Sequence, residues 1–326
     1  MSGPLLAVAS TGGHLNELRQ LVPRLDPAPE RVEWVTFDTQ QSRSQLANER
    51  VHFVQPTVTR DARAILANVR PGLRILRAVR PSAVISTGAG VALSFLPLAR
   101  AMGIPAHYVE SATRLSGPSS TGRVLAAVPG VRTYTQDRRW ESRSWIYRGS
   151  VFDAYEAAPP RAAPDALRRI VVVLGTNPYG FRRLLDRLVE ILPPGVEGVW
   201  QTGVTDPAGL PIDARRTLPA HELHGAMERA DVVVAHAGIG AALAALEHGR
   251  IPVLVPRRQD RGEQIDDHQL VVAGELADRG LAVCAEPETL DLAVLTEAAR
   301  LRATIRPDPP RFVLSGSPGR TRRRGR

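Results

Sequence analysis

The stretch Ala230–Leu243, ADVVVAHAGIGAAL, decides the fold class of this chain. Its apolar run Val232–Ala235 predicts a strand that is buried on both faces, because no polar residue alternates along it. Gly238 and Gly240 then predict a tight turn that leads into a helix over Ile239–Glu247. A strand, a glycine turn and a helix form the first half of a βαβ unit, from which parallel sheets are built.

The same order of elements recurs along the chain and indicates two doubly wound α/β domains in tandem. In the first half, the expected strands and helices are in turn Leu5–Ala9, Leu15–Leu25, Val32–Phe37, Gln41–Asn48, Ala83–Ile85, Val91–Met102, Ala106–Val109 and Thr121–Ala127. In the second half they are Ile170–Leu174, Phe181–Ile191, Val199–Gln201, Leu223–Arg229, Val232–Ala235, Ile239–Glu247, Val253–Val255 and Gln264–Arg279.

Composition shifts suggest where the domains begin and end. The stretch EAAPPRAAPD, at 156–165, has three prolines and no periodicity, which predicts a linker. We therefore expect one domain over 1–155 and a second over 166–312. The last residues, which include SGSPGRTRRRGR, cannot build a core, so a disordered basic tail is expected over 313–326.

The composition excludes several kinds of chemistry. Of the 326 residues, 43% are hydrophobic and 23% are charged, a balance typical of globular proteins. Cys284 is the only cysteine, which excludes an internal disulfide or a cysteine-based zinc or iron–sulfur site built from this chain alone and fits a reducing, cytosolic compartment. All 42 basic residues are arginine, so no mechanism can use a catalytic lysine, including that of P-loop NTPases.

The net charge of +9 is distributed unevenly. Residues 1–160 carry 19 Arg against 12 Asp and Glu (+7), residues 161–315 carry 18 against 21 (−3), and the tail adds five Arg (+5). This asymmetry favours an anionic partner for the first half, which is a nucleic acid, a phosphorylated substrate or an acidic membrane surface.

Residues 60–80 predict a basic amphipathic helix, broken at Pro71-Gly72, that suits an anionic membrane surface. An ordinary surface helix with a solvated basic face is the alternative. The helix lacks the interleaved aromatic residues of single-strand nucleic-acid binders. Its arginines are Arg63, Arg70, Arg74, Arg77 and Arg80.

The uncharged stretch Pro81–Ala99 is 19 residues long, the length of a transmembrane helix. It contains Thr87-Gly88-Ala89-Gly90 and Pro97, so a strand, a turn and the start of a helix describe it better. The N-terminus reaches a strand within five residues and lacks a basic region before an apolar one, so we expect no signal peptide.

Three further polar segments follow predicted strands, at the sheet edge where open α/β folds bind ligands. The first is the turn Ser10–His14, STGGH, which can present backbone N–H groups to an oxyanion and an imidazole to a hydroxyl. A tight turn with a surface histidine is its alternative. The second begins at Glu110, whose carboxylate can act as a general base, or instead cap a helix.

The third segment, Arg257–Gln269, reads RRQDRGEQIDDHQ and follows the predicted strand Val253–Val255. Its polar side chains can hold sugar hydroxyls, and Arg257 or Arg258 can pair with a diphosphate. A solvated helix start is the alternative. A metal site at Asp266, Asp267 and His268 is disfavoured, because adjacent residues on a helix do not share a face.

Taken together, these motifs resemble a known enzyme family. STGGHLNEL, VISTGAGVALSFLPLARAMGIPAHYVES and TRLSGPSSTG resemble the first subunit of the two-part UDP-sugar glycosyltransferases of bacterial exopolysaccharide synthesis and eukaryotic Alg complexes. VVVLGT, ADVVVAHAGIGAAL and PRRQDRGEQIDDHQLVVAGELADRGL resemble the second subunit, a MurG-like family 28 C-terminal domain. The resemblance covers about residues 5–285 and implies that both subunits are fused in one chain.

The resemblance implies a GT-B enzyme, in which two Rossmann-like domains face a cleft and the second binds a UDP-sugar. Related enzymes invert the anomeric centre without a bound metal and stabilise the leaving diphosphate at helix N-termini, which implies no cofactor here. The donor-binding residues that it implies, together with those expected from the third polar segment, are Gly175, Thr176, Gln201, Gly203, His236, Gly238, Gly240, Arg257, Glu263, Gln264 and Asp267.

In the first half, the resemblance places His14 and Glu110 near the lipid diphosphate and the attacking hydroxyl, so either can be the catalytic base. Thr11, Gly12, Gly13 and Arg114 are the expected acceptor and phosphate-binding residues. Two positions depart from the family pattern. Ala244 replaces a glutamate that would bind ribose, although Glu247 follows, and Ala241 replaces a hydroxyl residue near the phosphates.

The resemblance implies an inverting hexosyltransferase that moves a sugar from UDP to a polyprenyl-diphosphate-linked acceptor for surface polysaccharide assembly. We expect it to lie on the cytoplasmic face of the cell membrane as a peripheral protein, with no nucleic acid as partner. A non-hydrolysing UDP-sugar epimerase, a non-catalytic sugar-nucleotide sensor and a basic nucleic-acid binder are the alternatives.

Overall fold

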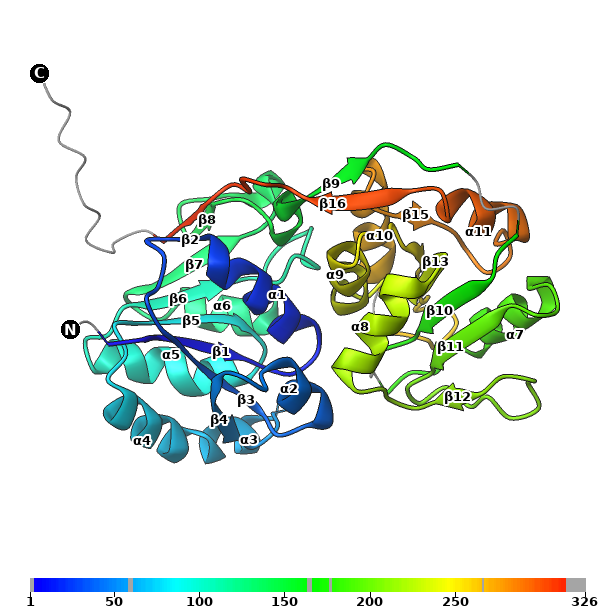
Figure 1. Ribbon diagram of the computed structural model, residues 1–326. Coiled ribbons are helices and arrows are strands. Elements are labelled where there is room, and N and C mark those ends of the chain that lie inside the picture. The colour runs from blue at the N-terminus through cyan, green and yellow to red at the C-terminus, as the bar shows by residue number, and fades with distance from the viewer. Residues whose placement is uncertain (1–2, 58–60, 163–165, 176–177, 266, 315–326) are drawn as a thin grey trace, which may run out of the picture. The chain divides into compact units, whose positions relative to one another are not determined.

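The computed structural model describes residues 3–57, 61–162, 166–175, 178–265 and 267–314. Its chain divides into two compact units, each with its own parallel sheet (Figure 1). The first unit comprises the chain up to Ser42, Leu46–Val151 and the chain from Pro310 onward. The second comprises Arg43–Gln45 and Phe152–Pro309.

The first unit contains a seven-stranded sheet in the order β4-β3-β1-β5-β6-β7-β8, in which every neighbouring pair is parallel. All five residues of the central strand β1 are buried, as expected of a strand covered on both faces. The strands are β1 (Leu5–Ala9), β3 (Val32–Phe37), β4 (Arg50–Val54), β5 (Ala83–Gly88), β6 (Ala106–Val109), β7 (Val131–Thr135) and β8 (Trp145–Tyr147).

From β1 the chain crosses to β3 on one side of it in the sheet, whereas from β5 it crosses to β6 in the opposite direction. Because both crossovers are expected to be right-handed, their helices lie on opposite faces of the sheet. Figure 1 accordingly shows α1 on one side of the sheet and α4 with α5 on the other. The helical segments of this half are α1 (Gly13–Leu21), η1 (Val22–Arg24), α2 (Gln40–Gln45), α3 (Ala62–Ala67), α4 (Val69–Val79), α5 (Val91–Ala101), α6 (Ser120–Ala126), η2 (Arg138–Trp140) and η3 (Val151–Ala154).

The basic helix expected over 60–80 is two helices, α3 and α4, but the expected break at Pro71-Gly72 is wrong. The break lies at Asn68, whose buried side chain accepts a hydrogen bond from the Gln55 N–H (3.1 Å) and donates one to the Gln55 carbonyl (2.8 Å). Pro71 lies in the first turn of α4, where a missing backbone N–H costs no intrahelical hydrogen bond.

The second unit contains a six-stranded parallel sheet in the order β12-β11-β10-β13-β14-β15. The strands are β10 (Arg169–Val173), β11 (Glu197–Gln201), β12 (Ala214–Arg215), β13 (Val232–His236), β14 (Val253–Val255) and β15 (Val283–Cys284). The helices are α7 (Arg182–Ile191), α8 (Ala220–Arg229), α9 (Ile239–Glu247), α10 (His268–Asp278) and α11 (Leu292–Ala298).

Helices α7 and α11 pack their leucine-rich faces on β10 and β13 and form the core on one side of this sheet. Helix α9, which the Ala230–Leu243 stretch predicts, begins and ends at the expected residues. The last expected helix begins later, at His268, because the preceding residues form a turn in which the Glu263 N–H donates to the Arg258 carbonyl.

Part of the expected linker is a strand. Residues Glu156–Ala158 belong to β9 (Tyr155–Ala158), which pairs antiparallel with β16 (Arg302–Ile305) in the second unit. The chain then enters the first unit again, where β17 (Phe312–Val313) pairs with β2 (Leu25–Asp26). The buried Arg24 side chain joins the segments around Ser150 and Pro310, because its guanidinium donates to the carbonyls of Ser150 (2.8 Å) and Pro310 (3.0 Å).

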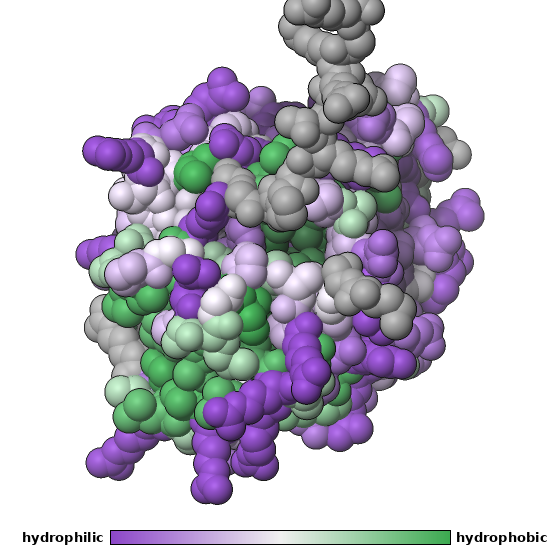
Figure 2. Space-filling model, turned by 90° about the vertical axis from the view of Figure 1, so that its left-hand side faces the viewer, coloured by the Kyte–Doolittle hydropathy of each residue, from purple (hydrophilic) through white to green (hydrophobic). Residues whose placement is uncertain are grey.

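The expected α/β fold with two parallel sheets is confirmed. Residues Pro81–Ala99 form β5, a turn and most of α5, and no helix in the described part of the chain is both long and apolar enough to cross a membrane. Figure 2 shows one face of the molecule, where apolar side chains gather in one area with charged side chains around it. Exposed large apolar residues of the first unit include Leu66, Met102 and Val124.

Candidate active site

The first candidate cluster lies at the carboxyl edge of the first sheet. Strands β1, β5 and β6 are neighbours, so the segments that follow them meet at this edge. The Ser10 N–H donates to the Gly88 carbonyl (2.9 Å), which joins the first two segments. Gly12, with φ of 80°, turns the chain into α1, and Gly13 is the first residue of that helix.

His14 sits in the first turn of α1 and packs its ring against Gly88, where an added Cβ would lie 3.1 Å from His14 Cε1. The Thr87 hydroxyl donates to the His14 carbonyl (2.7 Å), and His14 Nδ1 is buried without a hydrogen-bond partner. Burial lowers the pKa of His14 to about 4 against the opposing effect of the Thr87 backbone, and the nearby positive charge of Arg114 lowers it as well. The imidazole is therefore neutral at pH 7 and can accept a proton.

Glu110 is 1% exposed, and its carboxylate is fully engaged inside the protein. It accepts hydrogen bonds from the Ser119 N–H (2.9 Å), the Ser119 hydroxyl (3.0 Å) and the Tyr108 hydroxyl (3.1 Å). Ser119 is the N-cap residue of α6, and burial raises the pKa of Glu110. This geometry matches the alternative interpretation of Glu110 as an acid that supports a helix cap.

Glu17, to which the sequence analysis gave no role, is a buried carboxylate one turn after His14. It accepts hydrogen bonds from the Ser111 hydroxyl (2.5 Å), the Ala112 N–H (3.1 Å) and Gln136 Nε2 (2.9 Å). Burial raises its pKa to about 7 against the opposing effect of these donors. Glu17 could have been found from the sequence, because it is an acidic residue on the apolar face of the helix that begins at the glycine turn.

Glu17 thus ties α1 to the segment after β6 that carries Arg114. Arg114 is partly exposed, and its carbonyl accepts a hydrogen bond from Trp140 Nε1 (2.9 Å). Thr11 is partly exposed in the turn that precedes α1. The structure therefore brings Thr11, His14 and Arg114 to one edge of the first sheet, as expected.

The second candidate cluster lies at the carboxyl edge of the second sheet, where β10 and β13 end. The His236 ring lies against two glycines: an added Cβ would be 2.5 Å from its Cε1 at Gly175 and 2.1 Å from its Nε2 at Gly238. His236 Nδ1 donates to the Val173 carbonyl (3.1 Å), which leaves Nε2 as an acceptor. Burial lowers the pKa of His236 to about 3, and the charge of Arg257 acts in the same direction.

Arg257 is the principal cation of this edge and is 1% exposed. Its Nη2 donates to the Leu174 carbonyl (2.7 Å), whereas Nε and Nη1 are buried without partners. Its guanidinium carbon lies 5.7 Å from the centre of the Phe181 ring. Burial lowers its pKa to about 10, so the side chain remains charged at pH 7 with two donors available to an anion.

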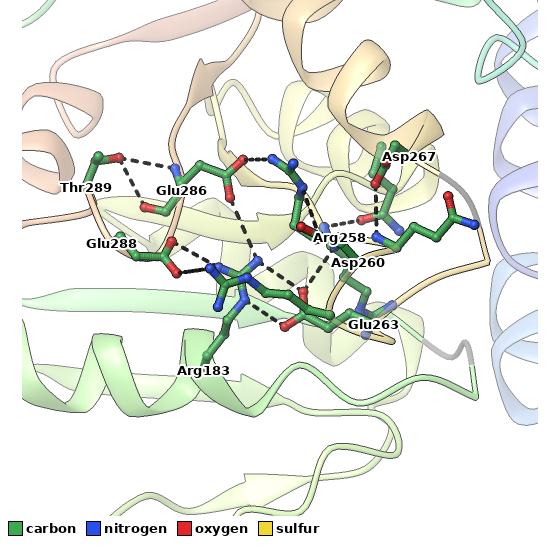
Figure 3. A network of polar contacts seen from close by, with 12 residues as sticks. Arg183, Arg258, Asp260, Glu263, Asp267, Glu286, Glu288 and Thr289 are labelled. Atoms are coloured by element: carbon green, nitrogen blue, oxygen red, sulfur yellow. Dashed lines mark hydrogen bonds and ion pairs between the residues drawn. The ribbon is translucent and has the colours of Figure 1, made fainter.

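Glu263 and Asp267 belong to a polar network (Figure 3). The Glu263 carboxylate accepts two hydrogen bonds from Arg183, from Nε (2.7 Å) and Nη2 (3.1 Å), and one from the Arg258 N–H (3.1 Å). Asp267 accepts one from the Gln259 N–H (2.9 Å). Arg183, Glu286 and Glu288 of this network were missed from the sequence because they lie far from the Arg257–Gln269 segment in the chain.

Gln264 differs from its neighbours. It is 6% exposed, its Oε1 accepts from the Ile265 N–H (3.0 Å), and its Nε2 is buried without a partner. One segment thus carries three donor nitrogens that have no acceptor in the described chain. They are Gln264 Nε2 and the Nε and Nη1 of Arg257. An unsatisfied buried donor is costly, and a ligand that accepts from it removes that cost.

The remaining expected donor residues have structural contacts. Gln201 Oε1 accepts from the Leu218 N–H (3.0 Å), and Gly203, with φ of 62°, donates its N–H to the Arg216 carbonyl. Gly240 is the second residue of α9. Thr176 lies outside the described residues. Within those residues, no group of three or more His, Cys, Asp or Glu side chains is placed to hold a metal ion.

Comparisons with known proteins bear directly on the second unit. Residues 213–304 match the model of the family described as Glycosyltransferase family 28 C-terminal domain. The matched residues all belong to the second unit. The matched segment contains the α9 turn, Arg257 and Gln264, whereas β10 and Gly175 lie before it.

A relative from Nitrobacter hamburgensis aligns with nearly the whole chain. It is a UDP-N-acetylglucosamine--N-acetylmuramyl-(pentapeptide) pyrophosphoryl-undecaprenol N-acetylglucosamine transferase, 26% identical over 355 residues that cover 97% of this chain and 92% of the relative.

Solved structures show the fold. MurG of Acinetobacter baumannii matches with a TM-score of 0.55 and 21% identity, covering 90% of this chain and 88% of that one. The spinosyn rhamnosyltransferase SpnG complexed with thymidine diphosphate matches with a TM-score of 0.53 and 18% identity, covering 92% and 89%. The expected GT-B fold is therefore confirmed.

Proposed function

We propose that this protein is an inverting glycosyltransferase that moves a sugar from a UDP-sugar to a polyprenyl-diphosphate-linked acceptor. The observation that carries the proposal is the edge of the second sheet, within the family 28 domain, where Arg257 and Gln264 keep buried donors without partners. A nucleotide diphosphate supplies acceptors for a guanidinium, and a sugar hydroxyl supplies one for an amide.

The proposal gives different roles to the expected donor residues, in keeping with their contacts in the second unit. Arg257 and the N-terminus of α9 bind the diphosphate and stabilise it as it leaves. Gln264 binds a hydroxyl of the transferred sugar through Nε2. Glu263 acts indirectly, because its carboxylate is held by Arg183 and the Arg258 backbone. His236 is neutral and positions the two glycine turns, since its Nε2 has no proton to offer a phosphate.

In the first unit, His14 is the proposed catalytic base. Its unpartnered Nδ1 and depressed pKa give a neutral imidazole at physiological pH, as proton abstraction from an acceptor hydroxyl requires. Arg114 supplies positive charge near His14 for the acceptor phosphates. Glu110 is given a structural role because it is buried and its carboxylate accepts four hydrogen bonds, from Tyr108, Ser111 and Ser119.

The membrane side of the proposal rests on α3 and α4. The arginines of these helices and of the α4 C-cap are exposed, and none forms an ion pair within the described chain. On the same two helices, Leu76 is fully buried and Leu66 is 69% exposed. A basic face with an exposed leucine suits attachment to anionic lipid on the cytoplasmic face of the membrane. The five arginines are Arg63, Arg70, Arg74, Arg77 and Arg80.

The experiment that tests this function combines radiolabelled UDP-glucose, UDP-glucuronate or UDP-N-acetylglucosamine with polyprenyl-diphosphate-sugar acceptors in anionic vesicles. We expect one donor to label the lipid fraction with inverted anomeric configuration. Conversion of the UDP-sugar without any acceptor would instead identify an epimerase. Binding of UDP without transfer to any acceptor would identify a sensor, and salt-dependent binding of DNA or RNA without UDP binding would overturn the proposal.

A further inference from the structure

A second basic cluster lies in the second unit, where the segment after α9 meets β9 and β16 (Figure 1). A pocket of about 300 Å³ opens there, and its lining includes Arg161, His248, Arg250 and Arg302. This volume is at the lower end for small-molecule sites and exceeds that of a single tetrahedral oxyanion. None of these four residues belongs to either candidate cluster described above.

The arrangement of the arginines is unfavourable without a counter-ion. Arg250 and Arg302 form an isolated antiparallel bridge, which places like charges directly opposite each other. Burial and, to a smaller extent, repulsion from Arg250 and Arg161 together lower the pKa of Arg302 to about 10. No carboxylate within the described chain forms an ion pair with Arg161, Arg250 or Arg302, and Asp231 and Glu228 act only from a greater distance.

Arg250 donates from Nε to the Met227 carbonyl (3.3 Å) and from Nη2 to the Glu228 carbonyl (2.6 Å), whereas other members of the cluster keep unsatisfied groups. The guanidinium of Arg302 donates from Nη1 to the carbonyls of Ala299 (2.8 Å) and Leu301 (2.7 Å), but its Nε is buried without a partner. His248 Nε2 is also buried without a partner. Arg161 forms hydrogen bonds with Arg300 only through its backbone, so its exposed side chain can move toward a ligand.

We propose that this pocket binds a phosphate group. Arg161, Arg250 and Arg302 line the pocket from three segments, and a phosphate offers several acceptor oxygens to guanidinium groups. Its two negative charges offset more of the repulsion than one carboxylate does. A free phosphate ion and the phosphate monoester headgroup of a lipid supply the same chemistry.

The experiment uses the full chain and inorganic phosphate as the probe, with heat of binding measured by calorimetry. The wild-type protein should bind one phosphate, and the double variant Arg161→Ser/Arg302→Met should bind it at least about tenfold more weakly. The single variant Arg161→Ser should show a smaller loss in the same direction, and because Arg161 is exposed its fold should persist. Arg300→Ser is the matched control, since Arg300 pairs with Glu297 (2.9 Å) beside the pocket without lining it.

A parallel arm measures sedimentation with phosphatidic acid vesicles against phosphatidylcholine vesicles. Phosphate binding that weakens in the Arg161→Ser/Arg302→Met variant identifies a free phosphate ligand, and vesicle binding alone with the same dependence identifies a lipid headgroup. Failure of the wild-type protein to bind either probe would overturn the proposal. Equal binding by the double variant and by the wild type would overturn it as well. Unchanged UDP affinity in all variants separates this result from the test of the donor site.

Discussion

His14 and His236 each lie at the carboxyl edge of one of the two parallel sheets, yet their surroundings differ. His14 is the second residue of α1 and His236 is the last residue of β13, and both lie beside a glycine turn and have a pKa lowered by burial. His236 donates to the Val173 carbonyl and packs between two glycines, whereas His14 Nδ1 faces the backbone at Thr87 and Gly88 without a hydrogen bond of good geometry. Similar glycine turns therefore hold one histidine firmly in place and leave the proposed base, His14, less constrained.

Whether such a histidine can take part in proton transfer therefore depends on whether one of its ring nitrogens is hydrogen-bonded to a backbone carbonyl. A carbonyl at hydrogen-bond distance fixes the tautomer and removes the ring from proton transfer. A ring that packs against glycine without such an acceptor keeps a free nitrogen. Five experiments test this contrast and the contacts around it.

The largest effect is expected from His14→Ala. Loss of the base should lower the rate of sugar transfer by about 10²–10⁴-fold and leave UDP affinity within about twofold of wild type. The matched variant His236→Ala should instead weaken UDP binding, because both glycine turns lose their support. Single-turnover rates and UDP calorimetry measure the two quantities, and an unchanged transfer rate in His14→Ala removes His14 from the mechanism.

The pH profile of the wild-type transfer rate gives a second view of His14. A base with a pKa of about 4 is unprotonated from pH 8 down to about pH 5. The rate should therefore hold over that range and fall as pH drops through about 4. A limb near pH 6.5 would mean that the base has an ordinary histidine pKa and would contradict the assignment.

Gly175→Ala should lower stability by about 3 kcal/mol or more. Its φ of 72° costs a β-carbon about 1–2 kcal/mol, and contact with His236 at 2.5 Å adds to it. Gly209→Ala is the matched control, because Gly209 has a φ of 79° with open space around an added Cβ. Denaturant unfolding measures the free energy of unfolding of both variants. Equal losses of stability would show that His236 does not pack closely against Gly175.

Glu17→Gln should remove part of the pH dependence of stability. The pKa of Glu17 is raised from about 4.5 in the unfolded chain to about 7 in the folded one, so the folded state binds the proton more tightly. Its contribution is fully present below pH 4.5 and is lost as pH rises through 7, amounting to about 2.5 kcal/mol between pH 5 and 8.

Unfolding measured across that pH range, wild type against Glu17→Gln, tests the assignment through the difference in slope. Glu17→Gln should flatten the profile, whatever its effect at a single pH. Parallel profiles for the two proteins would show that Glu17 titrates normally and that its burial does not organise the His14 edge.

The smallest effect is expected from Gln264→Ala. Loss of one amide donor to a sugar hydroxyl should change the preference between UDP-sugars by about tenfold. Gln259→Ala is the matched control, because Gln259 is exposed on the same segment. Competition between two UDP-sugars measures the preference, and an unaltered ratio in Gln264→Ala would exclude it from donor selection.

Much of the fold followed from local patterns. Strands β1, β3, β6 and β14 and helix α9 begin and end at the expected residues, because apolar runs between glycine turns leave few other ways to bury them. The break between α3 and α4 was misplaced, since it depends on the contact between Asn68 and Gln55. The strand β9 was also missed, because its partner β16 lies far along the chain.

For the candidate site, local patterns predicted which segments reach the sheet edges, since a segment that follows a buried parallel strand begins at its carboxyl edge. Placement made His14 and Arg257 candidates, and the family resemblance added the role of Gln264. Which side chains keep unpartnered groups at those edges became visible only in the tertiary structure. Glu110 and Glu263 are engaged by Ser119 and Arg183, and Glu17 is buried beneath a distant loop. Hydrogen-bond partners come from segments remote in the chain, and no local pattern of residues encodes them.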